Sequence, residues 1–240
     1  MTTGWVDCDR QAISRRYDRL AGLIPLFDRI LFVPHGLRGR AVDWLELGRG
    51  DSVLEIGCGP GNSLGYLRDA VGPFGHVYGV DLSREMLRRA RALCAAKQWR
   101  NVELIHNDAV DYTPPTALDG VLFSLSYNTM PHHRAVLRRA WSGLRPGGRL
   151  VIMDARLPSG PAAKLLLPLS IWFMKHTLLG NPLIQPWKEL AAVADNVDIR
   201  DRLFGCYYIC RGVKSVAAAS WRLAEPADAN DEMTRVIAAE

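Results

Sequence analysis

Features that would place the chain in an oxidising compartment or on a metal are scarce. Met1 to Trp5 contain neither a basic stretch nor an apolar core segment, so the sequence predicts no secretion signal. The 5 cysteines are an odd number and show no metal-binding or redox spacing. We therefore expect buried free thiols, no bound metal and a cytoplasmic location.

Long apolar runs are missing as well. The most apolar segment lies within residues 158–187, but Pro168, Lys175 and His176 interrupt it before the roughly 20 residues that a membrane span needs. The sequence has no internal repeat. A chain of 240 residues, 48% hydrophobic and 23% charged, is instead typical of one domain with an accessory segment.

Two common nucleotide-binding patterns are also absent. In residues 57–61 the glycines alternate, so the third glycine comes one residue too early for the dinucleotide pattern G-x-G-x-x-G. No Gly-Lys-Ser/Thr follows, which excludes a phosphate-binding P-loop. The ligand of this glycine loop must therefore be recognised in another way.

The glycine loop itself is the most informative feature of the sequence. An apolar run, Val53 to Ile56, contains Glu55 and is followed by Gly57, Gly59 and Gly61. Leu64 then begins a helical pattern, so the segment reads as a strand, a tight turn and a helix. Glycines there let the backbone approach a ligand closely, and the first amides of the helix favour polar or anionic groups.

Acidic residues at the ends of the next two strands narrow the ligand to an adenosine. The second strand ends at Asp81, which lies 20 residues after Gly61, where such folds place an acid on a ribose diol. The third strand ends in Asn107 and Asp108, and a side chain there can meet an adenine amino group. Three successive strands thus end in a glycine loop, an acid that can bind the ribose and an acid that can bind the edge of the adenine.

The periodicity predicts a fold that alternates strands and helices, which is typical of an α/β protein. Strands are expected at residues 52–57, 75–81, 101–106, 119–124 and 149–154. Helices are expected at residues 9–22, 26–47, 62–72, 83–98 and 131–144.

These motifs resemble those of class I S-adenosylmethionine-dependent methyltransferases. The shared motifs are E-x-G-C-G-x-G, the acid Asp81, Asn107-Asp108-Ala109 and the segment 144–150, and they cover residues 40–155 closely. The resemblance implies a doubly wound, Rossmann-like sheet of seven strands. Its last two strands would lie near residues 197–203 and 206–213, with the last one antiparallel. It also implies N-terminal helices, a helical insert after the fifth strand and S-adenosyl-L-methionine as cofactor.

The resemblance assigns roles to particular residues. In the family the glycine loop packs against the methionine part of the cofactor, the acid matched by Asp81 holds the ribose, and Asp108 and Ala109 would contact the adenine. Leu82 and Met86 would cover the adenine face. The cofactor-binding residues expected in this way are Glu55, Gly57, Gly59, Gly61, Asn62, Asp81, Leu82, Met86, Asn107, Asp108, Ala109 and Ser124.

The same resemblance, together with the composition, predicts the domain organisation. We expect an N-terminal helical lid at residues 1–47 and a methyltransferase domain at residues 48–213. The insert 158–187 would lie near the acceptor site, where its apolar character suits either a hydrophobic acceptor or ordinary packing. Residues 214–240 are rich in alanine and mixed charge and predict a poorly packed tail.

The N-terminal segment is basic and amphipathic. Between residues 10 and 40 only Asp18 and Asp28 are acidic, against arginines at 10, 15, 16, 19, 29, 38 and 40. Such a segment suits peripheral contact with an anionic membrane, and the alternative is a solvated face on a helix that covers the cofactor. A nucleic-acid partner is not expected, because the arginines form no clustered tract.

The start of the chain narrows the resemblance further. Arg16-Tyr17-Asp18-Arg19-Leu20-Ala21 is similar to the opening of ubiquinone/menaquinone C-methyltransferases and of bacterial phosphatidylethanolamine N-methyltransferases. This implies a membrane-derived acceptor, with Tyr17 closing over the cofactor. Residues 112–115 and 126–131 differ from the usual loops of the quinone enzymes. The narrower expectation is therefore a phospholipid headgroup amine.

Two alternatives to that acceptor stay open. The first is a methyltransferase of a soluble small metabolite or quinone, and the second is a cofactor-binding protein without catalysis.

Methyl transfer from a sulfonium asks the protein mainly to align the acceptor and to remove its proton. The candidates for this role are Tyr17, Tyr127 and His132, with Asn128 and His133 beside them. The alternative for either histidine is that it begins the next helix and faces water.

Overall fold

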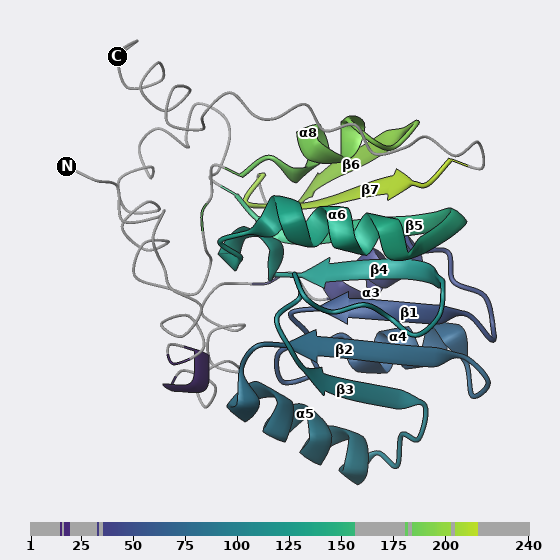
Figure 1. Ribbon diagram of the computed structural model, residues 1–240, viewed down its shortest axis with the longest axis vertical. Coiled ribbons are helices and arrows are strands. Elements are labelled where there is room, and N and C mark those ends of the chain that lie inside the picture. The colour runs from purple at the N-terminus through teal and green to yellow at the C-terminus, as the bar shows by residue number, and fades with distance from the viewer. Residues whose placement is uncertain are drawn as a thin grey trace.

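The computed structural model describes residues 15, 17–19, 33, 36–156, 181, 184–202 and 205–215. These residues form a 7-stranded sheet in the order β3-β2-β1-β4-β5-β7-β6 (Figure 1). The strands are β1 (Ser52–Ile56), β2 (His76–Asp81), β3 (Val102–His106), β4 (Leu118–Ser124), β5 (Leu144–Ala155), β6 (Val197–Arg202) and β7 (Tyr207–Val213).

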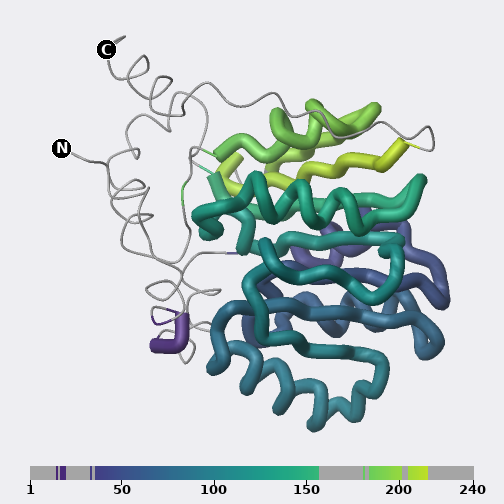
Figure 2. The backbone as a smooth tube through the Cα atoms, viewed as in Figure 1, coloured from purple at the N-terminus to yellow at the C-terminus, as the bar shows by residue number. Residues whose placement is uncertain are grey.

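Of the seven strands, β7 alone runs opposite to the others. Strand β1 pairs in parallel with both β2 and β4, so the strand order reverses between these two neighbours (Figure 2). Strand β7 lies antiparallel between β5 and β6. The predicted doubly wound, seven-stranded sheet with an antiparallel last strand is therefore confirmed. In such sheets ligands bind where the order reverses, at the carboxyl ends of the strands.

Helices cover both faces of the sheet (Figure 1). Buried residues of α3, α4 and α5 share one apolar cluster with the sheet, while those of α6 and α8 belong to the cluster on the opposite face. The helices are α3 (Leu37–Asp43), α4 (Leu64–Val71), α5 (Arg84–Ala96), α6 (His133–Gly143) and α8 (Pro186–Ala191), with a short 3₁₀ helix, η2 (Tyr127–Thr129).

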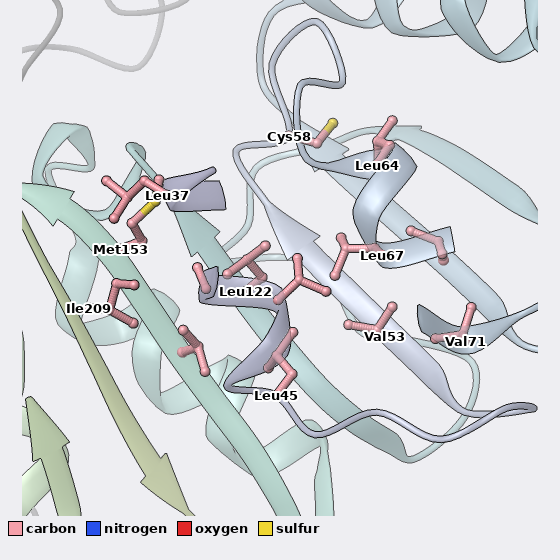
Figure 3. Close-up of a cluster of buried hydrophobic side chains, with 14 of the residues drawn as sticks. Leu37, Leu45, Val53, Cys58, Leu64, Leu67, Val71, Leu122, Met153 and Ile209 are labelled. Carbon is pink, nitrogen blue, oxygen red and sulfur yellow. The ribbon is translucent and has the colours of Figure 1, made fainter. Parts of the chain in front are cut away.

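The apolar residues of these elements recur at the spacing that each structure requires. Helix α4 buries Leu64, Leu67 and Val71, which lie three and four residues apart and so form one stripe. Figure 3 shows this stripe against Val53 of β1, with Leu37 of α3 and Ile209 of β7 in the same cluster. The cluster fixes α3 and α4 beneath the glycine loop that joins β1 to α4.

Most element boundaries agree with the expected ranges, and β5 is the main exception. It begins at Leu144, whereas the sequence pattern placed its start at residue 149. Leu144 pairs with Leu118, and an irregularity in the register separates this pair from Gly120–Arg149. At this bulge the chain turns at Pro146-Gly147 and still counts as part of β5. A search for alternating apolar residues does not detect such an interrupted start of a strand.

Part of the expected organisation lies outside the described residues. Of the expected helix 9–22, residues 15 and 17–19 are described and are helical. Of the expected helix 26–47, the structure shows α3 alone as a regular helix. Most of the insert 158–187 and of the tail 214–240 is not described. Within the described part of the chain, no helix has the length and apolar character needed to cross a membrane.

Candidate cofactor and acceptor site

A cavity of about 180 Å³ opens at the carboxyl ends of β1, β2, β3 and β4. Side chains from the loops after these strands, from residue 17 and from α3 line it. The lining residues are Tyr17, Arg38, Glu55, Gly57, Cys58, Gly59, Pro60, Asn62, Ser63, Val80, Asp81, Leu82, Met86, Asn107, Asp108, Ala109, Val110, Ser124, Leu125, Ser126, Thr129, Met130, Pro131, His132 and Val136. The cavity thus brings together 11 of the 12 residues expected to bind a cofactor.

The glycine loop needs glycine for two different reasons. Gly57 has φ of 70°, and a Cβ placed on it would lie 2.5 Å from Cβ of Ser126. Gly59 has φ of 54°, but a Cβ there would meet nothing within 4 Å. Gly57 therefore allows the close approach of the segment after β4, while Gly59 leaves open space at the edge of the cavity.

Gly61 is the expected cofactor residue that does not line the cavity. Its φ is 94°, and a Cβ there would lie 2.9 Å from Cδ1 of Leu64 and 3.3 Å from Cδ2 of Leu93. The absence of a side chain at Gly61 therefore serves the packing of α4 against α5. The resemblance implied a cofactor-binding role for Gly61, and the structure places this residue outside those that line the cavity.

Asp81 ends β2 with its carboxylate held by backbone amides on both sides. Gly59 donates its N–H to Oδ2 at 2.8 Å, and Ser83 donates its N–H to Oδ1 at 2.8 Å. Burial raises the pKa of Asp81 above its usual value, and these two amides oppose that effect. The carboxylate is therefore rigidly oriented toward the cavity that it lines.

Glu55 is a buried acid with an unused oxygen. It is 2% exposed, and its Oε2 has no hydrogen-bond partner among the described residues. Burial raises the pKa of Glu55 to about 8, although Ser63 and the charge of Arg38 act in the opposite direction. A cationic group in the cavity would satisfy this oxygen and favour the charged carboxylate.

The loop after β3 and the start of α5 form the opposite side of the cavity. Asp108 accepts a hydrogen bond from the backbone N–H of Val110 at 2.9 Å, which fixes the turn. Met86 is buried, and Leu82 and Val110 add apolar surface.

A side-chain hydrogen bond joins the glycine loop to the end of β4. Ser63 donates its hydroxyl to Oγ of Ser124 at 3.0 Å.

Of the expected catalytic residues, Tyr17 and His132 line the cavity and Tyr127 does not. Tyr127 is fully buried, and its hydroxyl donates to Oε2 of Glu189 at 2.5 Å. Burial raises its pKa well above the usual value, so it stays protonated. The structure therefore places Tyr127 behind the cavity, where it cannot contact a bound acceptor directly.

The neighbours of Tyr127 form a polar cluster that connects α8 to the segment after β4. Glu189 of α8 also accepts from Arg134 at 3.2 Å and lies 3.3 Å from Nε2 of His133. Asn128 is 2% exposed, and its side-chain amide donates to the carbonyl of Ala155 at 2.7 Å. His133 and Asn128 are therefore structural residues here. His132 lines the cavity, but it is also exposed and is the N-cap residue of α6, as the alternative for the histidines expected.

Several lining residues were not expected from the sequence. Arg38 reaches the cavity from α3, and Ser126, Thr129 and Met130 reach it from the segment after β4. A signal for Ser126 was available, because the segment directly follows an apolar strand at the point of strand reversal. Arg38 carried no such signal, since its position depends on how α3 packs under the sheet.

Comparisons with known proteins agree with the geometry of the site. Residues 53–148 match the family described as methyltransferase domain. The demethylmenaquinone methyltransferase of Listeria monocytogenes serotype 4a is 30% identical over 155 residues, which are 64% of this chain and 63% of that protein. The corresponding enzyme of Staphylococcus aureus is 30% identical over 166 residues, 68% of this chain and 66% of its own length.

Solved structures share the fold. The S-adenosylmethionine-dependent methyltransferase SibL, in its apo form, has a TM-score of 0.61 at 23% identity, covering 83% of this chain and 62% of that chain. This chain spans less than two thirds of the length of the curated relatives it matches. The family match and the structural neighbours imply S-adenosyl-L-methionine as the cofactor. The resemblance expected from the sequence is thus confirmed: residues 53–148 match a methyltransferase domain, the described residues share the fold of a solved S-adenosylmethionine-dependent methyltransferase, and the chain is similar to the quinone methyltransferases.

Proposed function

We propose that the chain transfers a methyl group from S-adenosyl-L-methionine to an apolar or amphipathic acceptor. The observation that carries this proposal is the continuity of the cavity. The cavity joins the glycine loop and its acids to a second group of residues after β4, namely Leu125, Ser126, Thr129, Met130, Pro131 and His132. We call this second group the acceptor side.

The residues of the cavity fit the proposed cofactor. Asp81 offers an oriented carboxylate for a ribose diol, and Leu82 and Met86 offer apolar surface for an adenine. Glu55 has the unsatisfied oxygen that an α-ammonium group would use, and Arg38 supplies a positive charge for a carboxylate. When bound, the cofactor supplies an electrophilic methyl group on a sulfonium whose leaving group is already activated.

The side chains of the acceptor side suit a neutral or weakly polar ligand. Its apolar residues are Leu125, Met130 and Pro131, and it has no acidic or basic side chain except His132. His132 offers an imidazole nitrogen that can accept a proton from a phenolic hydroxyl or an ammonium. Ser126 is fixed by donating its hydroxyl to the carbonyl of Ile56 at 2.6 Å. The residues after β4 are therefore held firmly enough to align an acceptor.

The first acceptor candidate is a quinol ring that bears an apolar tail. The relatives of this chain are named demethylmenaquinone methyltransferase, and an uncharged acceptor side suits such a ring. In this case His132 would accept the hydroxyl proton while the adjacent ring carbon takes the methyl group from the sulfonium, which leaves as the neutral thioether of S-adenosylhomocysteine. The methylated carbon then loses its hydrogen as a proton and the oxygen regains one, so the quinol ring is restored. The phospholipid headgroup amine is the second candidate, which the exposed Arg15 and Arg19 favour because they would approach anionic lipid.

Both candidates involve a lipid, so they extend the proposal to peripheral contact with the cytoplasmic face of a membrane. Exposed arginines attract anionic lipid through screened electrostatics. We expect binding to vesicles that contain phosphatidylglycerol, and we expect salt to weaken it. Binding that does not depend on salt would show that the arginines do not supply the contact, and the absence of binding would contradict the proposed membrane contact.

The test is transfer of label from methyl-labelled S-adenosylmethionine into a bacterial extract that is then split into lipid and aqueous phases. Label in the lipid phase supports the proposal, and mass analysis of the product separates a quinol from a headgroup amine. Label in the aqueous phase alone would move the search to soluble metabolites. No transfer, with intact cofactor binding, would identify a cofactor-binding protein without catalysis.

A further inference from the structure

A carboxylate from the N-terminal segment contacts the start of α5. Ser83 donates its hydroxyl to Oδ1 of Asp18 at 2.5 Å, and the backbone N–H of Glu85 donates to the same oxygen at 3.2 Å. In Figure 1 the short purple segment that contains Asp18 lies beside the first turn of α5. Residues 18 and 83 are thus joined although they are far apart in the chain.

Ser83 links this contact to the cofactor-binding residues. Its hydroxyl accepts from the backbone N–H of Met86 at 3.2 Å and so caps α5, while its own N–H donates to Asp81 at 2.8 Å. Asp81 in turn accepts from Gly59. A continuous series of hydrogen bonds therefore runs from Asp18 through Ser83 and Asp81 to the glycine loop.

The residue next to Asp18 lines the cavity. Tyr17 is half-buried and lies among the cavity residues, whereas its described neighbours Arg15 and Arg19 are exposed. Helices are held in place mainly by tertiary packing, so the position of Tyr17 depends on contacts between its segment and the rest of the fold. The bond between Asp18 and the start of α5 supplies such a contact at the position where Tyr17 enters the cavity.

We infer that Asp18 is a positioning residue, a latch that holds Tyr17 over the bound cofactor by docking on Ser83 and the first turn of α5. This inference rests on the proposed function, because it assumes that the cavity binds S-adenosylmethionine. The latch acts through Tyr17 and does not touch the cofactor itself. It links the position of Tyr17 to the same short loop that orients Asp81.

The electrostatics explain why the latch is a carboxylate. The positive end of the α5 dipole and its free amides favour a negative charge at Asp18. The charge of Asp18 also acts on its neighbour, since it contributes to the raised pKa of Asp81 after the larger effect of burial. The start of α5 therefore stabilises the negative charges of both Asp18 and Asp81, and this favours the docking of Asp18 there.

The experiment measures binding of S-adenosylhomocysteine to the full chain by calorimetry. The proteins are the wild type, Asp18→Ala, Tyr17→Ala and the double variant. We expect Asp18→Ala to weaken binding about tenfold, the effect of losing one charge-assisted hydrogen bond. In the Tyr17→Ala background the same change should have no further effect, because the latch would have nothing left to position.

A local control and a second readout separate positioning from general damage. Arg19→Ala should bind like the wild type, because Arg19 is exposed and its guanidinium donates to the backbone carbonyl of Arg15. In the wild type, S-adenosylhomocysteine should slow tryptic cleavage after Arg15 and Arg19, and in Asp18→Ala it should not. A purely structural defect would instead lower the melting temperature without removing this protection selectively.

The outcomes distinguish the latch from the proposed function. A wild type that fails to bind S-adenosylhomocysteine overturns the proposed function itself. If the wild type binds and Asp18→Ala binds equally well, the latch alone is wrong. Equal losses from Asp18→Ala with and without Tyr17, or equal protection from trypsin in both proteins, would also overturn it.

Discussion

Gly59 donates its backbone N–H to Oδ2 of Asp81, so the loop after β1 and the end of β2 are joined at 2.8 Å. The bond runs between two elements that each supply part of the proposed cofactor site. Because Ser83 holds the other oxygen of Asp81, the carboxylate cannot rotate away when the cavity is empty. Pre-orientation of this kind reduces the ordering that a ligand must impose when it binds.

Removal of the Asp81 carboxylate should therefore abolish cofactor binding. We expect Asp81→Ala to weaken S-adenosylhomocysteine binding by at least about a hundredfold, because two charge-assisted bonds to a diol are lost. Calorimetry measures the effect. Asp69→Ala is the matched control, since its side chain is 74% exposed and lies away from the cavity. Near-normal affinity of Asp81→Ala would refute the assignment of this residue.

The two glycines of the loop should respond differently to alanine. Gly57→Ala adds a Cβ that clashes with Ser126, so we expect a clear loss of folding stability, measured by denaturant unfolding. Gly59→Ala meets no protein atom within 4 Å and should cost about 1–2 kcal/mol from the left-handed backbone alone. Its added methyl group lies at the cavity, so binding of S-adenosylhomocysteine should weaken more than stability. Equal behaviour of the two variants would contradict this division.

Glu55 should make the stability of the ligand-free protein depend on pH. Its pKa rises from 4.5 to about 8 on folding, so the folded state binds the proton more tightly than the unfolded state. The resulting stabilisation is complete below about pH 4.5 and is lost as pH rises toward about 8. Glu55→Gln should therefore match the wild type at pH 4.5 and be more stable at pH 9.

The difference between these two proteins isolates Glu55. Burial raises the pKa of Asp154 to about 7, but Asp154 is the same in both proteins and its contribution cancels. We expect a gain on the order of 3–5 kcal/mol at pH 9 from the size of the shift. Chemical unfolding at both pH values measures it. A constant difference across pH would show that the carboxyl group is not protonated in the folded state.

The same acid should release a proton when the cofactor binds. A cationic α-ammonium beside Glu55 favours the carboxylate, so its pKa should fall below neutrality in the complex. At pH 7 binding of S-adenosylhomocysteine should then release close to one proton, roughly the full charge of one group. Calorimetry in buffers of different ionisation enthalpy detects the release, and Glu55→Gln should abolish it. Identical proton release by the variant would assign the effect to another group.

His132 and Tyr127 should separate catalysis from packing. We expect His132→Ala to lower turnover while S-adenosylhomocysteine affinity stays unchanged, because the imidazole lines the acceptor side. Tyr127→Phe should lower folding stability by about 1–2 kcal/mol, since Glu189 loses a buried donor, and should lower turnover less. Arg138→Ala, on the exposed face of α6, is the control. Full turnover by His132→Ala would show that the acceptor side is misplaced.

The parts of the site that could be predicted from the sequence are those with a local cause. Gly57, Asp81 and Asp108 each follow a strand, and parallel strands bring their carboxyl ends to one edge of the sheet. Their convergence is therefore a property of the fold class, and the fold class follows from alternating apolar and helical patterns. The same reasoning explains why nearly every strand boundary was predicted within a residue or two.

The parts that could not be predicted depend on distant segments. Tyr127 follows β4 as His132 does, but its environment is set by Glu189, 62 residues later. Arg38 enters the cavity because α3 packs on the sheet, and the partner of Asp18 lies 65 residues away at Ser83. Local patterns carry no information about such pairings, because they arise only when the elements are packed together.

The position of β7 between β5 and β6 has a consequence for the order in which the protein is made. Strand β5 is complete once Ala155 has been synthesised, but its partner β7 begins at Tyr207. Until then β5 is the open edge of a five-stranded parallel sheet, and its backbone amides from Arg149 onward lack their final neighbour. The emerging chain must therefore keep a long apolar edge from pairing with other chains until β7 arrives.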